Sequence, residues 1–237
     1  MLDPSLAAED SPRSGTTFAE AWLRRFAASA LATEAELTAL DQLLGDGDFG
    51  VNLTTGLRGA LRAIDAQESG GESGPFQAAA SAFLDDVGGT SGPLFGLLLQ
   101  ELATAIAATG ELNVSALATG LNGGLAAIQR VGDASPGDKT LVDALFPACA
   151  ALTAWPSSGD PAAALRGAAQ AAWQGVRDTA RMSARRGRAS YVGSRAEGVP
   201  DPGAVGVALF LSSAEDTVVD VAAQLRATGS DRPAAGG

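Results

Sequence analysis

The sequence contains no histidine, and Cys149 is the only cysteine in a chain of 237 residues. Without histidine the chain cannot supply a Ser-His-Asp triad, a histidine metal ligand or a phosphohistidine. A single cysteine excludes internal disulfide bonds and a cysteine-rich zinc site. Chemistry on this polypeptide must therefore use carboxylates, backbone amides, arginines and a hard metal ion.

Basic residues are also scarce, with 16 Lys and Arg against 27 Asp and Glu and a formal net charge of −11. This charge argues against nucleic acid or an anionic membrane surface as a partner. It also means that an anionic substrate needs a local cation in order to bind. The 46% hydrophobic and 18% charged composition is that of an ordinary globular domain.

The sequence shows no basic-then-apolar signal segment at its start. The longest apolar run, near residues 93–110, carries Gln100 and Glu101 and is expected to be too short to span a bilayer. We therefore expect a cytoplasmic protein. We also expect a flexible leader over 1–15, one domain over 16–228 and a flexible tail over 229–237.

Apolar residues recur at helical spacing, as Phe18, Trp22 and Phe26 do on one face of the first expected helix, and no convincing strand pattern with a period of two is found. Alanine and leucine, both strong helix formers, are abundant. The sequence therefore predicts an all-α fold of about eight helices in one domain. The expected helices cover 17–31, 34–44, 48–65, 76–87, 93–108, 114–130, 139–154, 161–186 and 203–227.

Capping signals predict several of these boundaries. Thr33 and Glu36 have the spacing of a capping box, and Gly45 is expected to end the helix that they begin. Asp138 is expected to cap the helix that begins at 139, and Asp201 to cap the last helix.

Three aspartates, Asp41, Asp46 and Asp48, lie within eight residues around the glycine-flanked turn GDGDFGVN. As structural residues, Asp48 would be a helix cap, Asp46 a turn residue and Asp41 a surface charge. As functional residues, the three would converge on a divalent cation, since Mg²⁺ and Ca²⁺ prefer carboxylate oxygens. The EF-hand ligand series is missing, so Mg²⁺ that carries phosphates fits better than a calcium sensor.

Two glycine-rich stretches offer candidate phosphate sites. GGTSGPLFG, residues 88–96, places free amides and hydroxyls at a helix start, although it could equally be an ordinary connecting loop. GDASPGDKT, residues 132–140, approaches a P-loop. Asp138 interrupts that motif, and the preceding residues predict a helix where a P-loop needs a strand, so the P-loop interpretation fails.

A cationic cluster, Arg185, Arg186, Arg188 and Arg195, stands out in this acidic chain. It could be a solvated helix end that complements the helix dipole. It could also clamp a phosphate, for which the planar guanidinium is well suited.

Four stretches occur together in the order and spacing of the nucleotide-binding L subunit of dihydroxyacetone kinases: DQLLGDGDFGVN, GGTSGPLFG, PGDKTLVDALFPA and GRASYVGSR with the later DPGA. The sequence resembles this family over about residues 17–225. The resemblance implies an antiparallel barrel of about eight amphipathic helices with a nucleotide site at one end.

The resemblance also implies the ligands of that site. Asp41, Asp46 and Asp48 match the family pattern that binds two Mg²⁺ ions, which hold the phosphates of ADP or ATP. No catalytic side chain is assigned. The implied nucleotide-binding residues are Phe49, Gly50, Val51, Asn52, Gly89, Thr90, Ser91, Gly132, Leu141, Arg188, Pro200, Asp201 and Pro202. Phe49 departs from the family, which usually has histidine there, and it could cover the nucleotide or join the core.

The implied activity is that of a kinase subunit, inactive alone, that presents a phosphoryl group to a small hydroxy-ketone held on a separate K subunit. The nucleotide could exchange, or bound ADP could be rephosphorylated by a phosphohistidine-bearing protein. A homodimer is open as well. The alternatives are a non-catalytic Mg-nucleotide-binding regulator and a kinase subunit for another acceptor, such as a tetrulose or a fatty acid.

Overall fold

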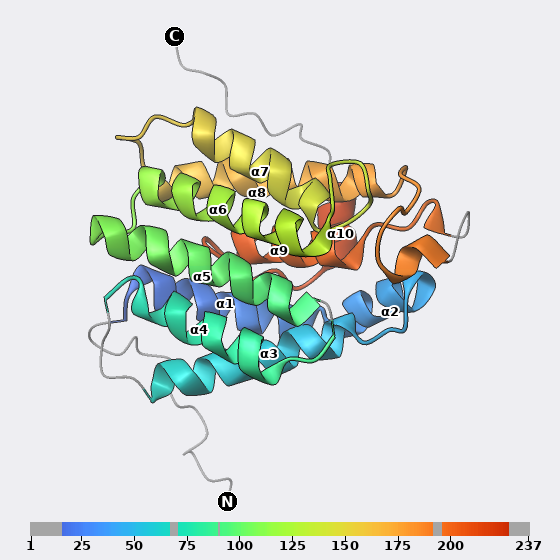
Figure 1. The fold of residues 1–237 in the computed structure, drawn as a ribbon, viewed down its shortest axis with the longest axis horizontal. Helices are drawn as coiled ribbons and strands as arrows, with labels where there is room; N and C mark the ends of the chain where they lie inside the picture. The colour runs from blue at the N-terminus through green and yellow to red at the C-terminus, as the bar shows by residue number, and fades with distance from the viewer. Residues whose placement is uncertain (1–15, 67–70, 90, 192–195, 228–237) are drawn as a thin grey trace, which may run out of the picture.

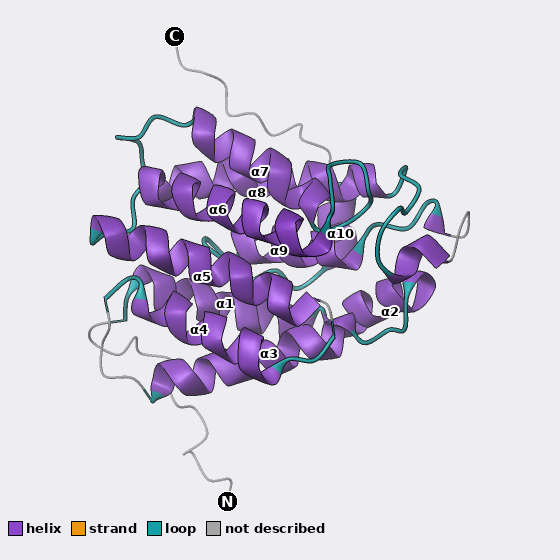
Figure 2. Cartoon of the chain, viewed as in Figure 1, coloured by secondary structure: helices purple, strands orange, loops and turns teal. Residues whose placement is uncertain are grey.

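The computed structural model describes residues 16–66, 71–89, 91–191 and 196–227, and every regular element in that part of the chain is helical (Figure 2). The all-α prediction is confirmed. The expected leader and tail lie outside the described residues. The helices are α1 (Phe18–Ala32), α2 (Glu34–Leu44), α3 (Phe49–Asp65), α4 (Gly74–Asp86), α5 (Ser91–Thr109), α6 (Val114–Gly132), α7 (Val142–Ala154), α8 (Pro161–Thr179), α9 (Pro202–Ser212) and α10 (Val221–Arg226), with a 3₁₀ turn η1 (Arg188–Tyr191).

The helices from α3 to α9 pack in chain order as antiparallel neighbours, and α1 closes the ring by packing against both α9 and α3 (Figure 1). Short connections between antiparallel helices alternate between the two ends of such a ring. The α2–α3, α4–α5, α6–α7 and α8–α9 connections therefore meet at one end of the barrel. This arrangement brings together four loops that are far apart in the sequence.

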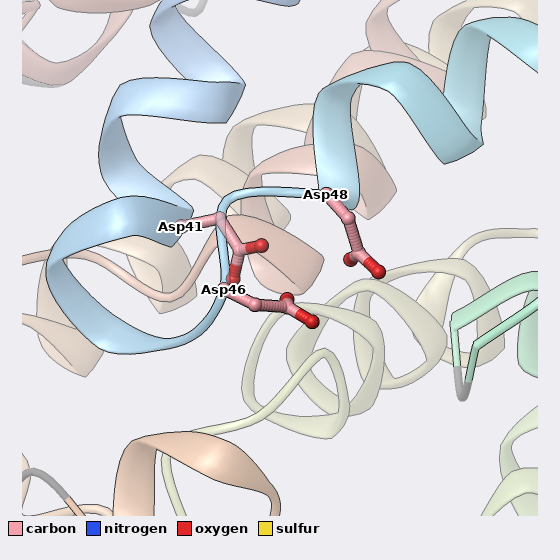
Figure 3. Close-up of side chains that lie close together, drawn as sticks. All are labelled: Asp41, Asp46 and Asp48. Carbon is pink, nitrogen blue, oxygen red and sulfur yellow. The ribbon is translucent and has the colours of Figure 1, made fainter.

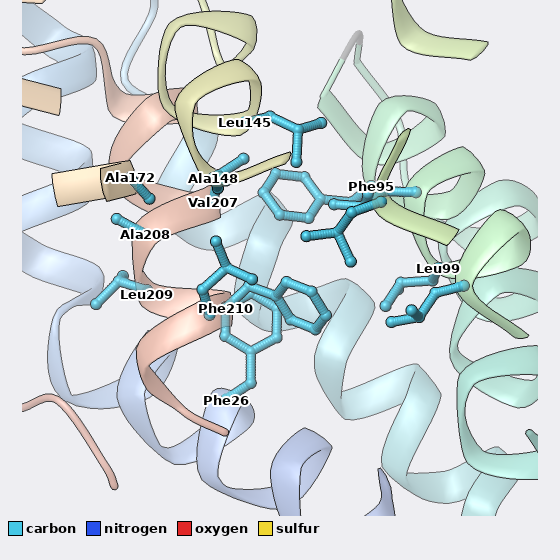
Figure 4. Close-up of a cluster of buried hydrophobic side chains, with 14 of the residues drawn as sticks. Phe26, Phe95, Leu99, Leu145, Ala148, Ala172, Val207, Ala208, Leu209 and Phe210 are labelled. Atoms are coloured by element: carbon cyan, nitrogen blue, oxygen red, sulfur yellow. The ribbon is translucent and has the colours of Figure 1, made fainter. Parts of the chain in front are cut away.

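Helix α9 is buried along almost its whole length, and its residues Val207, Ala208, Leu209 and Phe210 belong to the buried hydrophobic cluster of Figure 4. Phe210 is 1% exposed, and its ring lies 4.6 Å from that of Trp22 and 5.3 Å from that of Phe26, measured between centroids. Trp22 and Phe26 are one helical turn apart on the inward face of α1. The apolar face predicted for α1 thus packs against α9.

Helix α5 has the length and apolarity that a membrane-spanning helix requires. The expectation that this run is too short to span a bilayer is therefore wrong on length, since the helix has 19 residues. More than half of its apolar window is buried inside the barrel, and it packs between α4 and α6. Its apolar composition is accounted for by its place in the core.

Two predicted helices end early, and at each break a distant side chain binds backbone carbonyls. The helix expected over 161–186 ends at Thr179, whose carbonyl accepts a hydrogen bond from the ammonium of Lys139. The helix expected over 203–227 is divided into α9 and α10. At its break, the guanidinium of Arg25 donates to the carbonyls of Ser213 and Ala214.

Two capping predictions are wrong as well. The hydroxyl of Thr33 donates to the carbonyl of Ser29 and caps nothing, while Glu36 accepts the amides of Val221 and Ala222 at the start of α10. Helix α7 begins at 142, and Asp138 accepts the amide of Ser135 in the turn before it.

Candidate functional site

The carboxylates of Asp41, Asp46 and Asp48 come together at the end of α2 and the start of α3 (Figure 3). One oxygen from each lies within 4.8 Å of the other two. Asp41 is half-buried, whereas Asp46 and Asp48 are exposed. This grouping has the chemistry of a hard-cation site, since three carboxylate oxygens within one coordination sphere suit Mg²⁺ or Ca²⁺.

The backbone of the turn explains why the carboxylates meet. Gly47 has a φ of +79°, a left-handed conformation that side chains with a Cβ rarely adopt. A Cβ at Gly45 would lie 2.8 Å from Oδ1 of Asp41, so glycine leaves room for that carboxylate. Asp48 occupies the N-cap position of α3, yet its side chain makes no capping hydrogen bond. Its carboxylate is thus available to a ligand.

A cavity of about 190 Å³ lies beside the three aspartates, and all four loops at this end of the barrel contribute to it. Larger cavities lie elsewhere, such as one of about 420 Å³ between α8, α9 and α10. We place the site at the smaller cavity because the aspartates converge there. Its walls are formed by Asp41, Leu44, Asp46, Asp48, Phe49, Gly89, Ser91, Leu94, Lys139, Thr140, Leu141, Arg186, Gly187, Ala189, Asp201, Pro202 and Gly203.

The loop between α4 and α5 approaches the acidic turn directly. A Cβ placed on Gly89 would lie 3.4 Å from Nδ2 of Asn52 and 4.0 Å from Oδ2 of Asp48. Ser91 begins α5 and also lines the cavity. The start of a helix thus faces the aspartates, a position that suits an anion. Thr90 lies outside the described residues.

Several other predicted residues also line the cavity: Phe49, Leu141, Asp201 and Pro202. Phe49 does so from the core, being 5% exposed with its ring centroid 6.4 Å from that of Phe95. Asp201 caps α9 by accepting the amide of Ala204 at 2.7 Å, as predicted.

The remaining predicted residues whose side chains the structure describes, including Asn52, are not among its walls. A Cβ on Gly50 would collide with the carbonyl of Glu34, so Gly50 packs against α2. Val51 is exposed, Gly132 is exposed at the end of α6, and Pro200 is half-buried beside the cavity. Arg188 begins η1, and its side chain lies outside the described residues.

The sequence-based assignment missed several wall residues. Lys139 and Thr140 belong to the stretch that was rejected as a P-loop, and Arg186 belongs to the cationic cluster. Both stretches were considered in the sequence as candidate phosphate sites, but the sequence did not show which of their residues would line the cavity. Leu44, Leu94, Gly187, Ala189 and Gly203 gave no signal of their own.

Arg186 is held at the cavity by two carboxylates of the α6–α7 loop. Its guanidinium lies 2.9 Å from Asp133 and 3.6 Å from Asp138. The neighbouring Arg185 donates its backbone amide to the carbonyl of Asp138 at 3.1 Å. The cationic cluster is therefore anchored beside the site through Arg185 and Arg186 and is more than a solvated helix end.

Two titratable groups with shifted pKa values also lie in the walls, Lys139, which is buried, and Asp201, which is half-buried. Burial raises the pKa of Asp201 to about 7, and the charges of Asp143 and Asp41 act in the same direction. Burial lowers the pKa of Lys139, against the opposing effect of the nearby carboxylates of Asp201, Asp143 and Glu197. Among the residues that the structure describes, the cavity walls carry four carboxylates (Asp41, Asp46, Asp48, Asp201) and two cations (Lys139, Arg186), so this part of the site favours an anion that arrives with a cation.

A helical barrel with an acidic turn, a helix start and an arginine segment at one end defines a class of proteins, and comparison with known families identifies it. The model of the DAK2 domain matches residues 43–216. The chain belongs to this family.

Relatives of established name fall into two groups. The L-erythrulose 1-kinase of Mycolicibacterium smegmatis is 38% identical over 76% of this chain and 32% of its own length. The human triokinase/FMN cyclase is 38% identical over 80% of this chain and 33% of its own length. The chain thus spans about a third of such relatives. In contrast, it covers 94% of the ADP-binding subunit DhaL of a PEP-dependent dihydroxyacetone kinase from Listeria innocua, at 31% identity over 84% of this chain.

Solved structures agree with this assignment. The dihydroxyacetone kinase of C. freundii in complex with AMP-PNP and Mg²⁺ matches 90% of this chain and 36% of its own, with a TM-score of 0.61 and 25% identity. Its native form matches with a TM-score of 0.62. The barrel described above is therefore a fold that this chain shares with part of a dihydroxyacetone kinase.

Proposed function

We propose that this chain binds ADP or ATP with two Mg²⁺ ions at the cavity and serves as the L subunit of a kinase for small hydroxy-ketones. The observation that carries this proposal is the convergence of Asp41, Asp46 and Asp48 on a cavity walled by three further loops. A structural relative was solved in complex with AMP-PNP and Mg²⁺, which supports the choice of ligand.

The residues have distinct tasks in this proposal. Mg²⁺, held by the three aspartates, would neutralise phosphate charge and polarise the phosphoryl group. The start of α5 at Ser91 offers amides to the phosphates, and Arg186 adds a positive charge. Leu94 and Leu141 provide an apolar wall suited to a nucleobase.

The acceptor is held elsewhere, on a separate K-type subunit. In the family this subunit captures the ketone through histidine, and the present chain has none. Dihydroxyacetone is our first candidate, because a relative that the chain covers almost entirely is named a subunit of dihydroxyacetone kinase. A four-carbon ketose is the second candidate, since other relatives are named erythrulose kinases.

Thermal unfolding with matched ligands tests the nucleotide site. A ligand at about 100 times its Kd stabilises the native state by roughly 2.7 kcal/mol. Saturating Mg-ADP should raise the Tm by several degrees, while ADP with EDTA should have little effect because the cavity is acidic. An unchanged Tm with saturating Mg-ADP contradicts the proposal.

A reconstitution assay tests the subunit role. The chain should phosphorylate neither dihydroxyacetone nor L-erythrulose alone, and a K-type subunit should create activity toward one of them. Supplying ATP, or a phosphohistidine-bearing protein with bound ADP, distinguishes the two donors. Robust phosphorylation by the pure chain alone refutes the subunit role.

A further inference from the structure

Lys139 is the only lysine in the chain, and it is 1% exposed. Its ammonium donates to the carbonyl of Thr179 at 2.6 Å and to that of Val199 at 2.7 Å. Thr179 ends α8, and Val199 lies two residues before Asp201, the cap of α9. One buried cation thus joins the point where the chain leaves the barrel to the point where it returns.

Other hydrogen bonds close the chain at the same place. The amide of Gly198 donates to the carbonyl of Ala180 at 2.8 Å, and the amide of Asp201 donates to the hydroxyl of Thr179 at 2.9 Å. Fixing both ends of a long connection restricts where the residues between them can lie. The described residues of this connection that line the cavity are Arg186, Gly187 and Ala189.

The backbone around Lys139 is built to hold it in place. Its φ is +63°, which is uncommon for a residue with a Cβ. The carboxylate of Asp143 accepts the amides of Gly137 and Thr140, which fixes the turn on both sides of Lys139. Thr140 and Leu141, which follow, also line the cavity.

We propose that Lys139 is a positioning residue for the nucleotide site: its ammonium fixes the wall that carries Arg186 and Asp201 relative to the wall formed by Thr140 and Leu141. This inference rests on the proposed function. It predicts that a Lys139 variant binds the nucleotide more weakly, because without the ammonium the two walls are no longer fixed relative to the aspartates.

Variants of Lys139 test this, with the Kd for Mg-ADP measured by calorimetry well below each Tm. Lys139→Met keeps the approximate length of the side chain but removes the ammonium that joins the carbonyls of Thr179 and Val199, and we expect at least tenfold weaker binding. Lys139→Arg retains charge and donors and should recover part of this loss. Arg181→Ala is the matched control. Arg181 is an exposed cation on the same connection and pairs with Asp178 at the end of α8, so its loss should leave the Kd unchanged.

A second measurement uses the wild-type protein, so it holds even where a variant fails to fold. Acetylation of Lys139 by an N-hydroxysuccinimide ester, followed by peptide mass spectrometry, reports on this side chain separately from the α-amino group. Mg-ADP should slow the acetylation at least threefold, because an occupied cavity holds both walls closed around the ammonium.

The outcomes separate the two proposals. Wild-type protein that fails to bind Mg-ADP overturns the proposed function and this inference with it. Wild-type binding with a Lys139→Met Kd within threefold of wild type, or with an acetylation rate that Mg-ADP does not change, overturns the inference alone. In that case Lys139 is a structural residue only.

Discussion

The backbone amide of Phe49 donates a hydrogen bond to Oδ2 of Asp41 at 3.1 Å. A carboxylate from the last turn of α2 thereby satisfies an amide at the start of α3, which the side chain of Asp48 leaves uncapped. Asp41 thus has a structural task as well as a place in the acidic cluster. The tasks of the aspartates can therefore be separated by mutation.

Asp48→Asn should weaken metal binding at little cost in stability. The substitution removes a negative charge from the cluster but breaks no capping bond, so the free energy of unfolding should change by less than about 0.5 kcal/mol. Affinity for Mg²⁺, measured by competition with Mn²⁺, should fall at least tenfold. An unchanged Mn²⁺ affinity would remove Asp48 from the metal site.

The matched control is Asp160→Ala, which should show the opposite behaviour. Asp160 caps α8 by accepting the amides of Ala162 and Ala163, and it does not line the cavity beside the aspartate cluster. Loss of such a cap costs about 1 kcal/mol. Urea denaturation should show this loss while the Mn²⁺ affinity stays at the wild-type value.

Phe49→Ala should act mainly on stability. The ring is 5% exposed and packs against Phe95, so its removal should cost about 3–5 kcal/mol in the free energy of unfolding. If the ring also covers the nucleotide, the Kd for Mg-ADP should rise roughly twofold to tenfold. Urea midpoints and calorimetric titration together measure both effects.

Phe95→Ala is the control for Phe49. Phe95 is 2% exposed and packs against Phe49 and Phe83, but it does not line the cavity. It should lose comparable stability with no specific change in affinity. Equal changes in Kd for the two variants would assign Phe49 to the core alone.

The sequence was sufficient to predict those parts of the fold and site that depend on local pattern. The spacing of Trp22 and Phe26 gave the inward face of α1, and the glycines around Asp46 gave the turn that gathers the carboxylates. Both features are encoded within a few residues, so helical periodicity and turn chemistry find them.

The errors arose where a distant side chain competes for a backbone group. Nothing near Thr179 in the sequence shows that Lys139 binds its carbonyl at the end of α8. In the same way, Arg25 lies 188 residues before the Ser213 carbonyl that it binds. The individual wall residues of the cavity depend on such contacts, which is why Arg186 could be predicted only as a member of a cluster.

Arg186→Ala should weaken nucleotide binding without unfolding the protein. Its ion pairs with Asp133 and Asp138 are partly exposed, and such pairs contribute at most about 1 kcal/mol to stability. Loss of a cation from an acidic cavity should raise the Kd for Mg-ADP about tenfold, and less at high salt. Arg166→Ala, which removes the ion pair with Glu215 on the outside of α8, should leave the Kd unchanged. Equal affinities for the two variants would exclude Arg186 from the site.

Asp201 should make stability fall as pH rises from about 4 to about 7. Burial raises its pKa from 3.8 to about 7 in the native state, so the native protein binds this proton more tightly than the unfolded chain does. Under linkage, the resulting stabilisation is complete below the unfolded pKa and is lost as pH rises through the native value. Asp201→Asn keeps an oxygen that can cap α9 and is neutral throughout. The free energy of unfolding of wild type minus that of Asp201→Asn, from urea titrations at several pH values without Mg²⁺, should therefore decrease across this range. A difference that stays constant from pH 4 to pH 7.5 would show that the native fold does not raise the pKa of Asp201.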